Sequence, residues 1–254
     1  MMHHKSDYWR RTGILSMAAA AVTLGAVNAD EPLWGGHEGK LEVTSTTFTK
    51  NGPLPDSAIY NAVSQGVNIC TADGAPGGDE SPQLHWSHAP ANTRSFVVVM
   101  YDTTAAFTHW GMYDIAPSLR SLPQNAGVAG SSYGSEVNND FGDPSYDGPC
   151  PPAGVAPDAH HYVFTVYALD TRLEVSTLPN FPANAETLYH ALIRAARHGH
   201  ILASGSLGTF YSDTPANGSP PGRSGFSSRA ATRSARCDSA RRRMSPLDSC
   251  CVQA

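Results

Sequence analysis

Five segments of the chain carry the hydrophobic patterns of β-strands. Two of them are continuous apolar runs, a pattern typical of strands that are covered on both faces of a sheet, and the others alternate or are short. The five segments are residues 41–48, 95–101, 109–115, 162–169 and 201–211. In the last segment, Gly205 and Gly208 predict a bend or a bulge, because glycine inside a strand often marks one.

One further segment has the pattern of an α-helix. Asn184 can cap its start, and Gly199 ends it. Leu188, Leu192 and Ala195 share one face of this helix. The segments between the strands are rich in glycine and proline, of which the chain has 23 and 19. This composition argues against a helical bundle, and a compact domain keeps long loops mainly where they form a site. We therefore expect a mainly β domain with few helices.

The N-terminal segment has the composition of a secretory signal peptide. An apolar run over residues 13–27 follows Arg10 and Arg11 and leads to Ala29, with small residues at the positions that signal peptidase reads. The run is about fifteen residues long, short of the roughly twenty that span a bilayer. The sequence therefore predicts a signal peptide over residues 1–29 and a mature chain that starts near Asp30. We expect an exported protein, periplasmic or secreted, that is not an integral membrane protein.

The C-terminal residues 213–254 predict a disordered tail. They are rich in serine, glycine, proline and arginine and have almost no aromatic or β-branched residues, so they cannot bury enough surface to offset their ordering entropy. The total charge is −5; because residues 1–29 carry +2 and residues 212–254 carry +4, residues 30–211 carry −11. An acidic body repels the phosphate backbone of nucleic acid, so nucleic acid is excluded as the main partner.

Five cysteines in an exported chain point to disulfide bonds. Cys70 and Cys150 lie inside the body, whereas Cys237, Cys250 and Cys251 lie in the tail. The adjacent pair in the tail is poorly placed to bridge to itself without backbone strain. We therefore predict a structural disulfide between Cys70 and Cys150.

Polar side chains suited to chemistry gather at the predicted strand ends. Asp102 closes one strand, His109 opens the next, and His160 stands just before the strand over residues 162–169. These three places can meet at one edge of a sheet. Between them lies the segment 146–152, which is too rich in proline for a strand or a helix and should form a rigid loop suited to a pocket wall.

Five motifs follow one family pattern in order and spacing. They are DESPQLHW at 79–86, the strand end at Asp102, THW at 108–110, GPCPP at 148–152 and HHY at 160–162. Over about residues 41–211 the chain resembles the phosphatidylethanolamine-binding protein family, in its bacterial Raf-kinase-inhibitor-like branch. The resemblance implies a single domain over residues 30–212. Its fold would be a large antiparallel β-sheet packed with a smaller sheet and one or two peripheral helices.

The resemblance also implies a pocket at one end of the sheet that holds a phosphate or phosphoryl group. In the family pattern an acid ends one strand, a histidine starts the next, a Gly-Pro pair closes over the ligand, and a His-x-Tyr pair completes the site. The matching residues are Asp102, His109, Gly148, Pro149, His160 and Tyr162. Histidines can offer a phosphate hydrogen bonds and, when protonated, positive charge, and a nearby carboxylate favours the protonated form.

The chain departs from the family pattern in the segment after Asp102. Thr104 replaces the second acid of the family's Asp-Pro-Asp-Ala-Pro segment, and both prolines are absent. Losing a carboxylate weakens the repulsion of a phosphate dianion, and losing the prolines loosens the loop. The ligand preference of this chain therefore stays open.

We expect an exported, non-catalytic domain that binds an anionic phosphate-bearing small molecule or lipid head group, without a cofactor or a metal. Two other classes stay open. One is a protein-interaction module that inhibits a protease or another enzyme. The other is a zinc hydrolase built on Asp102, His109 and His160, although no His-x-x-x-His or Cys-x-x-Cys pair supports it.

Overall fold

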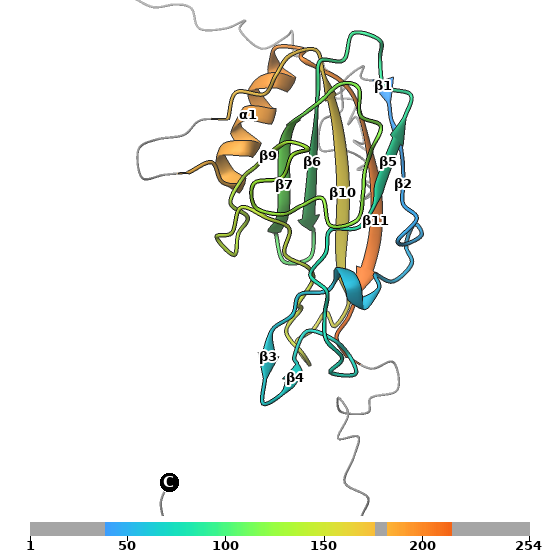
Figure 1. Cartoon of the computed structure of the whole chain (residues 1–254), viewed down its shortest axis with the longest axis vertical. Helices are drawn as coiled ribbons and strands as arrows, with labels where there is room; N and C mark the ends of the chain where they lie inside the picture. Colours follow the sequence, from blue (N-terminus) through green and yellow to red (C-terminus); the bar gives the residue numbers. More distant parts are fainter. Residues whose placement is uncertain (1–38, 176–181, 215–254) are drawn as a thin grey trace, which may run out of the picture. The chain divides into compact units, whose positions relative to one another are not determined.

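A six-stranded sheet forms the body of the protein (Figure 1). The computed structural model describes residues 39–175 and 182–214. The sheet has the order β1-β11-β10-β6-β7-β9, and its four long strands are antiparallel neighbours. β1 pairs with β11 in parallel, so the sheet is mixed and not wholly antiparallel as expected. The strands are β1 (Gly39–Lys40), β6 (Ser95–Asp102), β7 (Phe107–Ile115), β9 (Ser135–Glu136), β10 (His160–Leu169) and β11 (Ile201–Tyr211).

In the described part of the chain, two smaller sheets and two helical segments complete the fold. A three-stranded sheet has the order β2-β5-β8, and β3 and β4 form a separate hairpin. The elements are β2 (Glu42–Thr44), the 3₁₀ helix η1 (Asp56–Ala58), β3 (Val63–Ser64), β4 (Val67–Asn68), β5 (Leu84–Ser87), β8 (Ser121–Leu122) and α1 (Ala185–Arg197). The prediction of a mainly β domain with a large sheet, a smaller sheet and few helices is confirmed.

Apolar side chains cover both faces of the main sheet. Phe96 and Val98 of β6 pack on one face in the same core as Trp86 of the three-stranded sheet. The rings of Trp86 and Phe96 have their centroids 5.2 Å apart. On the opposite face, Val97 packs in a second core with Leu188 of α1. Burial on both faces is the physical reason why the sequences of β6 and β10 are continuous apolar runs.

The helix α1 lies where the sequence predicts it. Asn184 accepts a hydrogen bond from the backbone N–H of Thr187 over 3.0 Å, and the Thr187 hydroxyl accepts one from the backbone N–H of Asn184 over 2.9 Å. This capping box satisfies two backbone donors at the start of the helix. At the other end Gly199 has a φ of 70°, a conformation that glycine adopts without steric cost.

The predicted strand over residues 41–48 is shorter in the structure. Of this segment, only β2 pairs with another strand. The Gln83 side chain accepts a hydrogen bond from the backbone N–H of Thr46 over 2.7 Å and a second from the Thr46 hydroxyl over 3.0 Å. The Gln83 side chain thus takes the hydrogen bond of the Thr46 N–H, which a longer strand would donate to a neighbouring strand, and β2 ends before Thr46.

Of the predicted bend or bulge at Gly205 and Gly208, the bulge is wrong. The pairing of β10 with β11 is regular through both glycines, and its irregularity lies between Ala168 and Leu169. Gly205 is needed for a different reason, because a Cβ added there would lie 2.3 Å from the carbonyl oxygen of Leu41. The glycine therefore allows another segment of backbone to approach the strand closely.

A disulfide joins Cys70 to Cys150, as predicted. The predicted signal peptide over residues 1–29 lies outside the described residues, and so does the predicted tail apart from Asp213 and Thr214. Asp213 is buried, so the folded part reaches at least this far. Within the described ranges, none of the helices has the length and apolar character to cross a bilayer.

Candidate functional site

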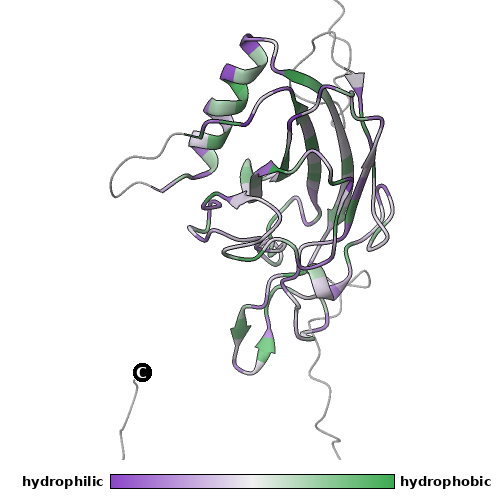
Figure 2. Ribbon diagram, turned by 45° about the horizontal axis from the view of Figure 1, so that its top comes forward, coloured by the Kyte–Doolittle hydropathy of each residue, from purple (hydrophilic) through white to green (hydrophobic). Residues whose placement is uncertain are grey.

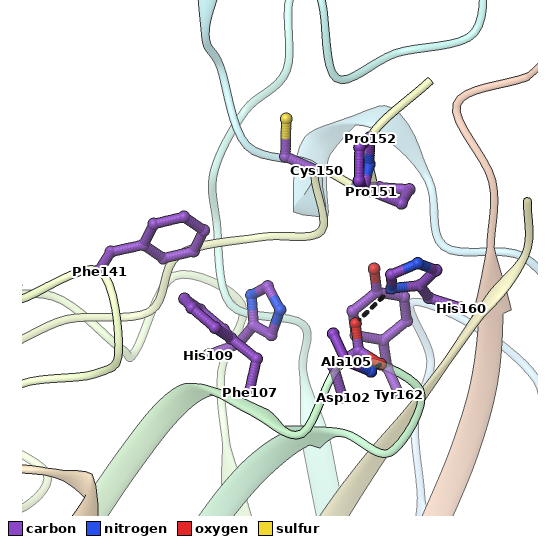
Figure 3. Close-up of a pocket in the computed structure, with 10 residues that line it drawn as sticks. All are labelled: Asp102, Ala105, Phe107, His109, Phe141, Cys150, Pro151, Pro152, His160 and Tyr162. Carbon is purple, nitrogen blue, oxygen red and sulfur yellow. Dashed lines mark hydrogen bonds and ion pairs between the residues drawn. The ribbon is translucent and has the colours of Figure 1, made fainter. Parts of the chain in front are cut away.

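Three strand ends meet at one end of the main sheet and form a pocket there (Figure 3). β6 ends at Asp102, which lies across the sheet from Tyr162 of β10 and from Phe107 at the start of β7. Because these strands are antiparallel neighbours, the end of one lies beside the starts of the other two. The pocket between these strand ends and the loop that contains Pro151 has a volume of about 190 Å³.

Polar side chains and an apolar wall share the pocket lining. The polar residues are Asp102, His109, His160 and Tyr162, and the wall consists of Ala105, Phe107, Phe141, Cys150, Pro151 and Pro152. The structure thus brings together four of the six residues that the sequence pointed to. The other two, Gly148 and Pro149, precede the wall in the chain and are not among the residues that line the pocket.

A buried pair of side chains, Asp102 and His160, forms the polar centre of the pocket. The Asp102 side chain is 2% exposed and His160 as a whole is 8% exposed. His160 Nδ1 donates a hydrogen bond to Asp102 Oδ2 over 2.6 Å, and the other carboxylate oxygen accepts the backbone N–H groups of Thr104 and Ala105 over 2.8 and 3.0 Å. Asp102 therefore closes the turn between β6 and β7 and at the same time fixes the His160 ring, with Nε2 left to meet a ligand.

Thr104, which stands where the family pattern has its second acid, does not line the pocket. Its hydroxyl accepts a hydrogen bond from the backbone N–H of His161 over 3.0 Å. The turn of this chain is completed by Ala106, which has a φ of 54°. The departure from the family pattern therefore changes how the turn is held and leaves Asp102 as the carboxylate among the lining residues.

His109 lies among aromatic rings beneath the apolar wall. It is 3% exposed, and its ring centroid is 5.3 Å from that of Tyr162 and 5.6 Å from that of Phe141. Burial lowers the pKa of His109, while hydrogen bonds to the backbone at Asp147 and Gly148 and the charge of Asp102 act in the opposite direction. His109 is therefore expected to be neutral at physiological pH and to offer a ligand hydrogen bonds only.

The proton of neutral His109 lies on Nδ1, because this atom is 2.8 Å from the carbonyl oxygen of Asp147, which can only accept. Tyr162 is also a neutral group. It is 1% exposed, and burial, followed by the charge of Asp102, raises its pKa. The Tyr162 hydroxyl therefore stays protonated at physiological pH and can donate a hydrogen bond.

Gly148 and Pro149 place the pocket wall without being part of it. The Gly148 backbone N–H donates to Asp79 Oδ1 over 2.7 Å, and the Pro149 carbonyl accepts from the backbone N–H of Tyr60 over 3.3 Å. A Cβ on Gly148 would lie 2.3 Å from the carbonyl oxygen of Ala58, so this position has room only for glycine. These contacts fix the start of the segment whose next three residues form the wall.

Carboxylates surround the base of this wall. Asp79 and Asp147 share a hydrogen bond, and burial together with the charge of Asp147 raises the pKa of Asp79 to about 6. Burial also raises the pKa of Asp147, whose Oδ2 accepts a hydrogen bond from the Asn139 amide over 2.6 Å. The pocket lining contains neither lysine nor arginine. The site is therefore polar but is not a basic pocket.

Phe141 and Phe107 are lining residues that the sequence analysis missed. Phe141 is a single aromatic residue in the polar segment 138–143, and it is 45% exposed although its ring stacks on Tyr60 with centroids 5.4 Å apart. A lone aromatic side chain in a polar loop is a signal that could have identified it. Phe107 precedes His109 by two residues on the same strand, and side chains two apart in a strand share a face.

The described residues contain no group of three His, Cys, Asp or Glu side chains that is placed to hold a metal ion. His160 Nδ1 and Asp102 Oδ2 are bonded to each other, and His109 Nδ1 is bonded to a carbonyl oxygen. These bonds use Nδ1 of both histidines and orient the two rings.

Comparison with known proteins identifies the fold and the family. A family model for the phosphatidylethanolamine-binding protein matches residues 44–212. The UPF0098 protein YbhB of Escherichia coli is 32% identical over 180 residues, which cover 68% of this chain and 100% of YbhB. LppC of Mycobacterium tuberculosis, which is named as a candidate lipoprotein, is 37% identical over 115 residues, or 41% of this chain and 54% of LppC.

A solved structure agrees with these sequence matches. The crystal structure of Escherichia coli YbcL, described as a new member of the mammalian PEBP family, has a TM-score of 0.54 to this chain at 27% sequence identity. The match covers 68% of this chain and 98% of YbcL. The family model spans all the strand ends that form the pocket. The chain therefore belongs to the phosphatidylethanolamine-binding protein family.

Proposed function

We propose that the protein is an exported, non-catalytic binder of a small phosphate-bearing group, either a free phosphorylated compound or the head group of a phospholipid. The observation that carries the proposal is the buried Asp102–His160 pair in a cavity of about 190 Å³. That volume is smaller than the roughly 300–1,000 Å³ of pockets for drug-sized ligands. A phosphate with a short substituent fits such a space, and the acyl chains of a lipid do not.

The donors of the pocket suit phosphate oxygens. The Tyr162 hydroxyl keeps its proton and shares a hydrogen bond with Asp102, and His160, whose Nδ1 is bonded to the same carboxylate, presents Nε2 to the pocket. The wall formed by Phe107, Phe141 and the prolines places apolar side chains beside these polar groups, and a hydrogen bond is stronger next to an apolar surface than in water. These features support recognition of an anion by oriented donors.

The lining residues offer little for covalent chemistry. Cys150 is held in a disulfide, and the raised pKa of Tyr162 makes its hydroxyl a poor nucleophile. Both carboxylate oxygens of Asp102 accept hydrogen bonds from groups within the protein. This supports a binding role in preference to a catalytic one.

Three observations support export. The apolar segment 13–27 has the composition of a signal peptide. The relative LppC carries the name of a candidate lipoprotein, a class of exported protein. A disulfide between Cys70 and Cys150 also fits an oxidising compartment.

Calorimetric titration of phosphoethanolamine into the full chain tests the binding site. His160→Ala and His109→Ala should each weaken binding at least about tenfold, the equivalent of about one good hydrogen bond to a charged group. His85→Ala is the matched control, since His85 is exposed on β5 and is not among the residues that line the pocket. Equal affinity in all four proteins would refute the site. Release of inorganic phosphate that depends on His160 would refute the non-catalytic role.

A further inference from the structure

The β3–β4 hairpin exposes apolar side chains at the end of the domain where the pocket lies (Figure 1). Val63 is 64% exposed, Val67 is 42% exposed and Ile69 is 53% exposed. These three residues are called the apolar tip. Figure 2 shows both strands of the hairpin in the colour of hydrophobic residues, projecting from the rest of the domain. Such side chains in a small projecting hairpin indicate a contact surface.

Both legs of the hairpin lead directly into the pocket wall. On one side, Tyr60 stacks on Phe141, which lines the pocket, with an angle of 4° between the rings. On the other side, Cys70 follows Ile69 and is bonded to Cys150, another lining residue. The apolar tip is therefore fixed to the pocket by a covalent bond and a ring stack, and whatever the tip touches lies close to a ligand in the pocket.

The hairpin is built to be surrounded rather than covered from one side. Val63 lies opposite Asn68, and Ser64 lies opposite Val67. Because paired side chains share a face, Val63 lies on one face of the ribbon, and Val67 and Ile69 lie on the other. A flat partner would cover only one of these faces. An apolar medium into which the tip inserts would cover both.

The charge pattern favours an uncharged medium. Residues 57–72 and residues 148–157 contain no lysine, arginine, aspartate or glutamate, although residues 30–211 carry −11. Near the pocket, Asp79 and Asp147 add negative charge. An anionic lipid surface would be repelled by this body, because basic residues are what anchor proteins to such surfaces. A surface of zwitterionic lipids carries no such penalty.

We propose that the apolar tip inserts into the interface of a bilayer of zwitterionic phospholipids and so places the pocket at the level of the lipid head groups. This inference rests on the proposed function, since it makes a lipid the source of the phosphate-bearing group. A head group held in a pocket too small for acyl chains stays attached to a lipid in the bilayer. The tip enters the same bilayer beside it.

Fluorescence quenching by brominated lipid tests the insertion at a single position. In Val63→Trp, vesicles of phosphatidylcholine and phosphatidylethanolamine with brominated acyl chains should quench emission beyond the quenching seen in the wild-type chain. Val128→Trp is the matched control, because Val128 is 42% exposed in the loop between β8 and β9. It should show no added quenching. Comparison with the wild type removes contributions from the tryptophans already in the chain.

A second variant measures the contribution of the tip. Val63→Ser/Ile69→Ser should lower the partition coefficient onto these vesicles at least about tenfold, since full burial of one such side chain corresponds to about that factor. Its titration with soluble phosphoethanolamine should match that of the wild type, which also shows that the variant is folded.

Two results would overturn the docking inference. They are no added quenching in Val63→Trp and equal quenching in Val128→Trp. A concentration-dependent dimer that the double variant loses, without vesicle binding by the wild type, would assign the tip to a second copy of the chain instead. Failure of the wild type to bind soluble phosphoethanolamine refutes the proposed function, so the two failures are distinguished.

Discussion

Substitutions of Asp102 can distinguish the contributions of two sets of hydrogen bonds that this side chain makes. One carboxylate oxygen accepts two backbone N–H groups of the β6–β7 turn, and the other accepts Nδ1–H of His160. Asp102→Asn keeps an oxygen for the turn but presents an amide donor to His160. Two donors would then face each other, so the hydrogen bond to Nδ1–H of His160 is lost in this arrangement. Asp102→Ala removes both sets of bonds.

The structure gives an expected magnitude for each variant. A hydrogen bond between charged groups contributes about 1.5–3 kcal/mol and a neutral one about 1 kcal/mol, so Asp102→Asn should cost about 1–2 kcal/mol of unfolding free energy. The pair is almost fully buried, so solvent screens it little. Asp102→Ala should cost about 1–2 kcal/mol more, because the turn loses two hydrogen bonds to one carboxylate oxygen, while water can replace them at the exposed positions Thr104 and Ala105.

Ligand binding should respond differently from stability. When His160 is protonated, the wild-type pair has no net charge but points its positive end into the pocket. In Asp102→Asn the hydrogen bond that orients the His160 ring is lost. Phosphoethanolamine affinity should therefore fall at least about tenfold in both variants, although their stabilities differ.

Guanidinium denaturation and calorimetric titration measure these two quantities on the same samples. Equal destabilisation by Asp102→Asn and Asp102→Ala would show that the turn bonds contribute nothing. An affinity in Asp102→Asn equal to or above that of the wild type would mean that repulsion between the ligand and the carboxylate outweighs the orientation of His160, and the reasoning above would be refuted.

Three further predictions concern the frame around the site. Burial raises the pKa of Glu136 from 4.5 to about 8, while Trp110 Nε1 donates a hydrogen bond to one of its oxygens and the other oxygen is buried without a partner. A carboxyl group whose pKa is raised by folding contributes its full stabilisation only below its pKa in the unfolded chain. The free energy of unfolding of the wild type should therefore fall as the pH rises from about 4.5 to 8. The upper limit of this loss of stability is roughly 5 kcal/mol. We expect Glu136→Gln to be about 2 kcal/mol more stable than the wild type in urea denaturation at pH 9 and equal to it at pH 4. Parallel curves of unfolding free energy against pH for the two proteins would contradict this. Ala106→Gly should raise the free energy of unfolding by about 1 kcal/mol, because Ala106 has a φ of 54°, and a lower thermal midpoint in this variant would count against it. Replacing both Cys70 and Cys150 by alanine opens a loop with a sequence separation of 80 and should cost about 2–4 kcal/mol under denaturant, with weaker phosphoethanolamine binding because Cys150 lines the pocket; unchanged binding would separate the disulfide from the site.

The elements that could be predicted from the sequence are those whose local patterns identify them without knowledge of their tertiary contacts. β6 and β10 are buried on both faces, and α1 has a capping box and a terminating glycine. The short strands were harder, because β1, β3, β4, β8 and β9 have only two residues each and owe their pairing to neighbours. Gly205 shows a different limit. A bulge and a close approach of another backbone both demand the absence of Cβ, so sequence alone does not separate them.

In the site, too, residues that belong to sequence motifs could be predicted, whereas features that depend on tertiary surroundings could not. The residues that meet at strand ends could be identified from order and spacing, since strand direction alone brings Asp102 and His160 together. Phe141 comes from a loop whose path depends on Asn139, which accepts several backbone N–H groups of the turn that follows it. The protonation of His109 depends on the rings packed around it. Neither is encoded in a local pattern.

The charge balance of the pocket predicts which phosphate it prefers. His109 is neutral at physiological pH because burial lowers its pKa, and His160 is bonded to the Asp102 carboxylate. Since no lysine or arginine lines the pocket, little positive charge remains to balance a dianion, and the nearby Asp79 and Asp147 oppose one. We therefore expect glycerophosphoethanolamine, whose phosphodiester is a monoanion like that of a lipid head group, to bind more tightly at pH 8 than phosphoethanolamine, whose phosphate is then a dianion. Lowering the pH should narrow the difference, because the monoester then gains a proton and His109 becomes able to charge. Tighter binding of the dianion at pH 8 would show that positive charge reaches the ligand from outside the lining residues, and the lipid head group would lose its advantage as the natural ligand.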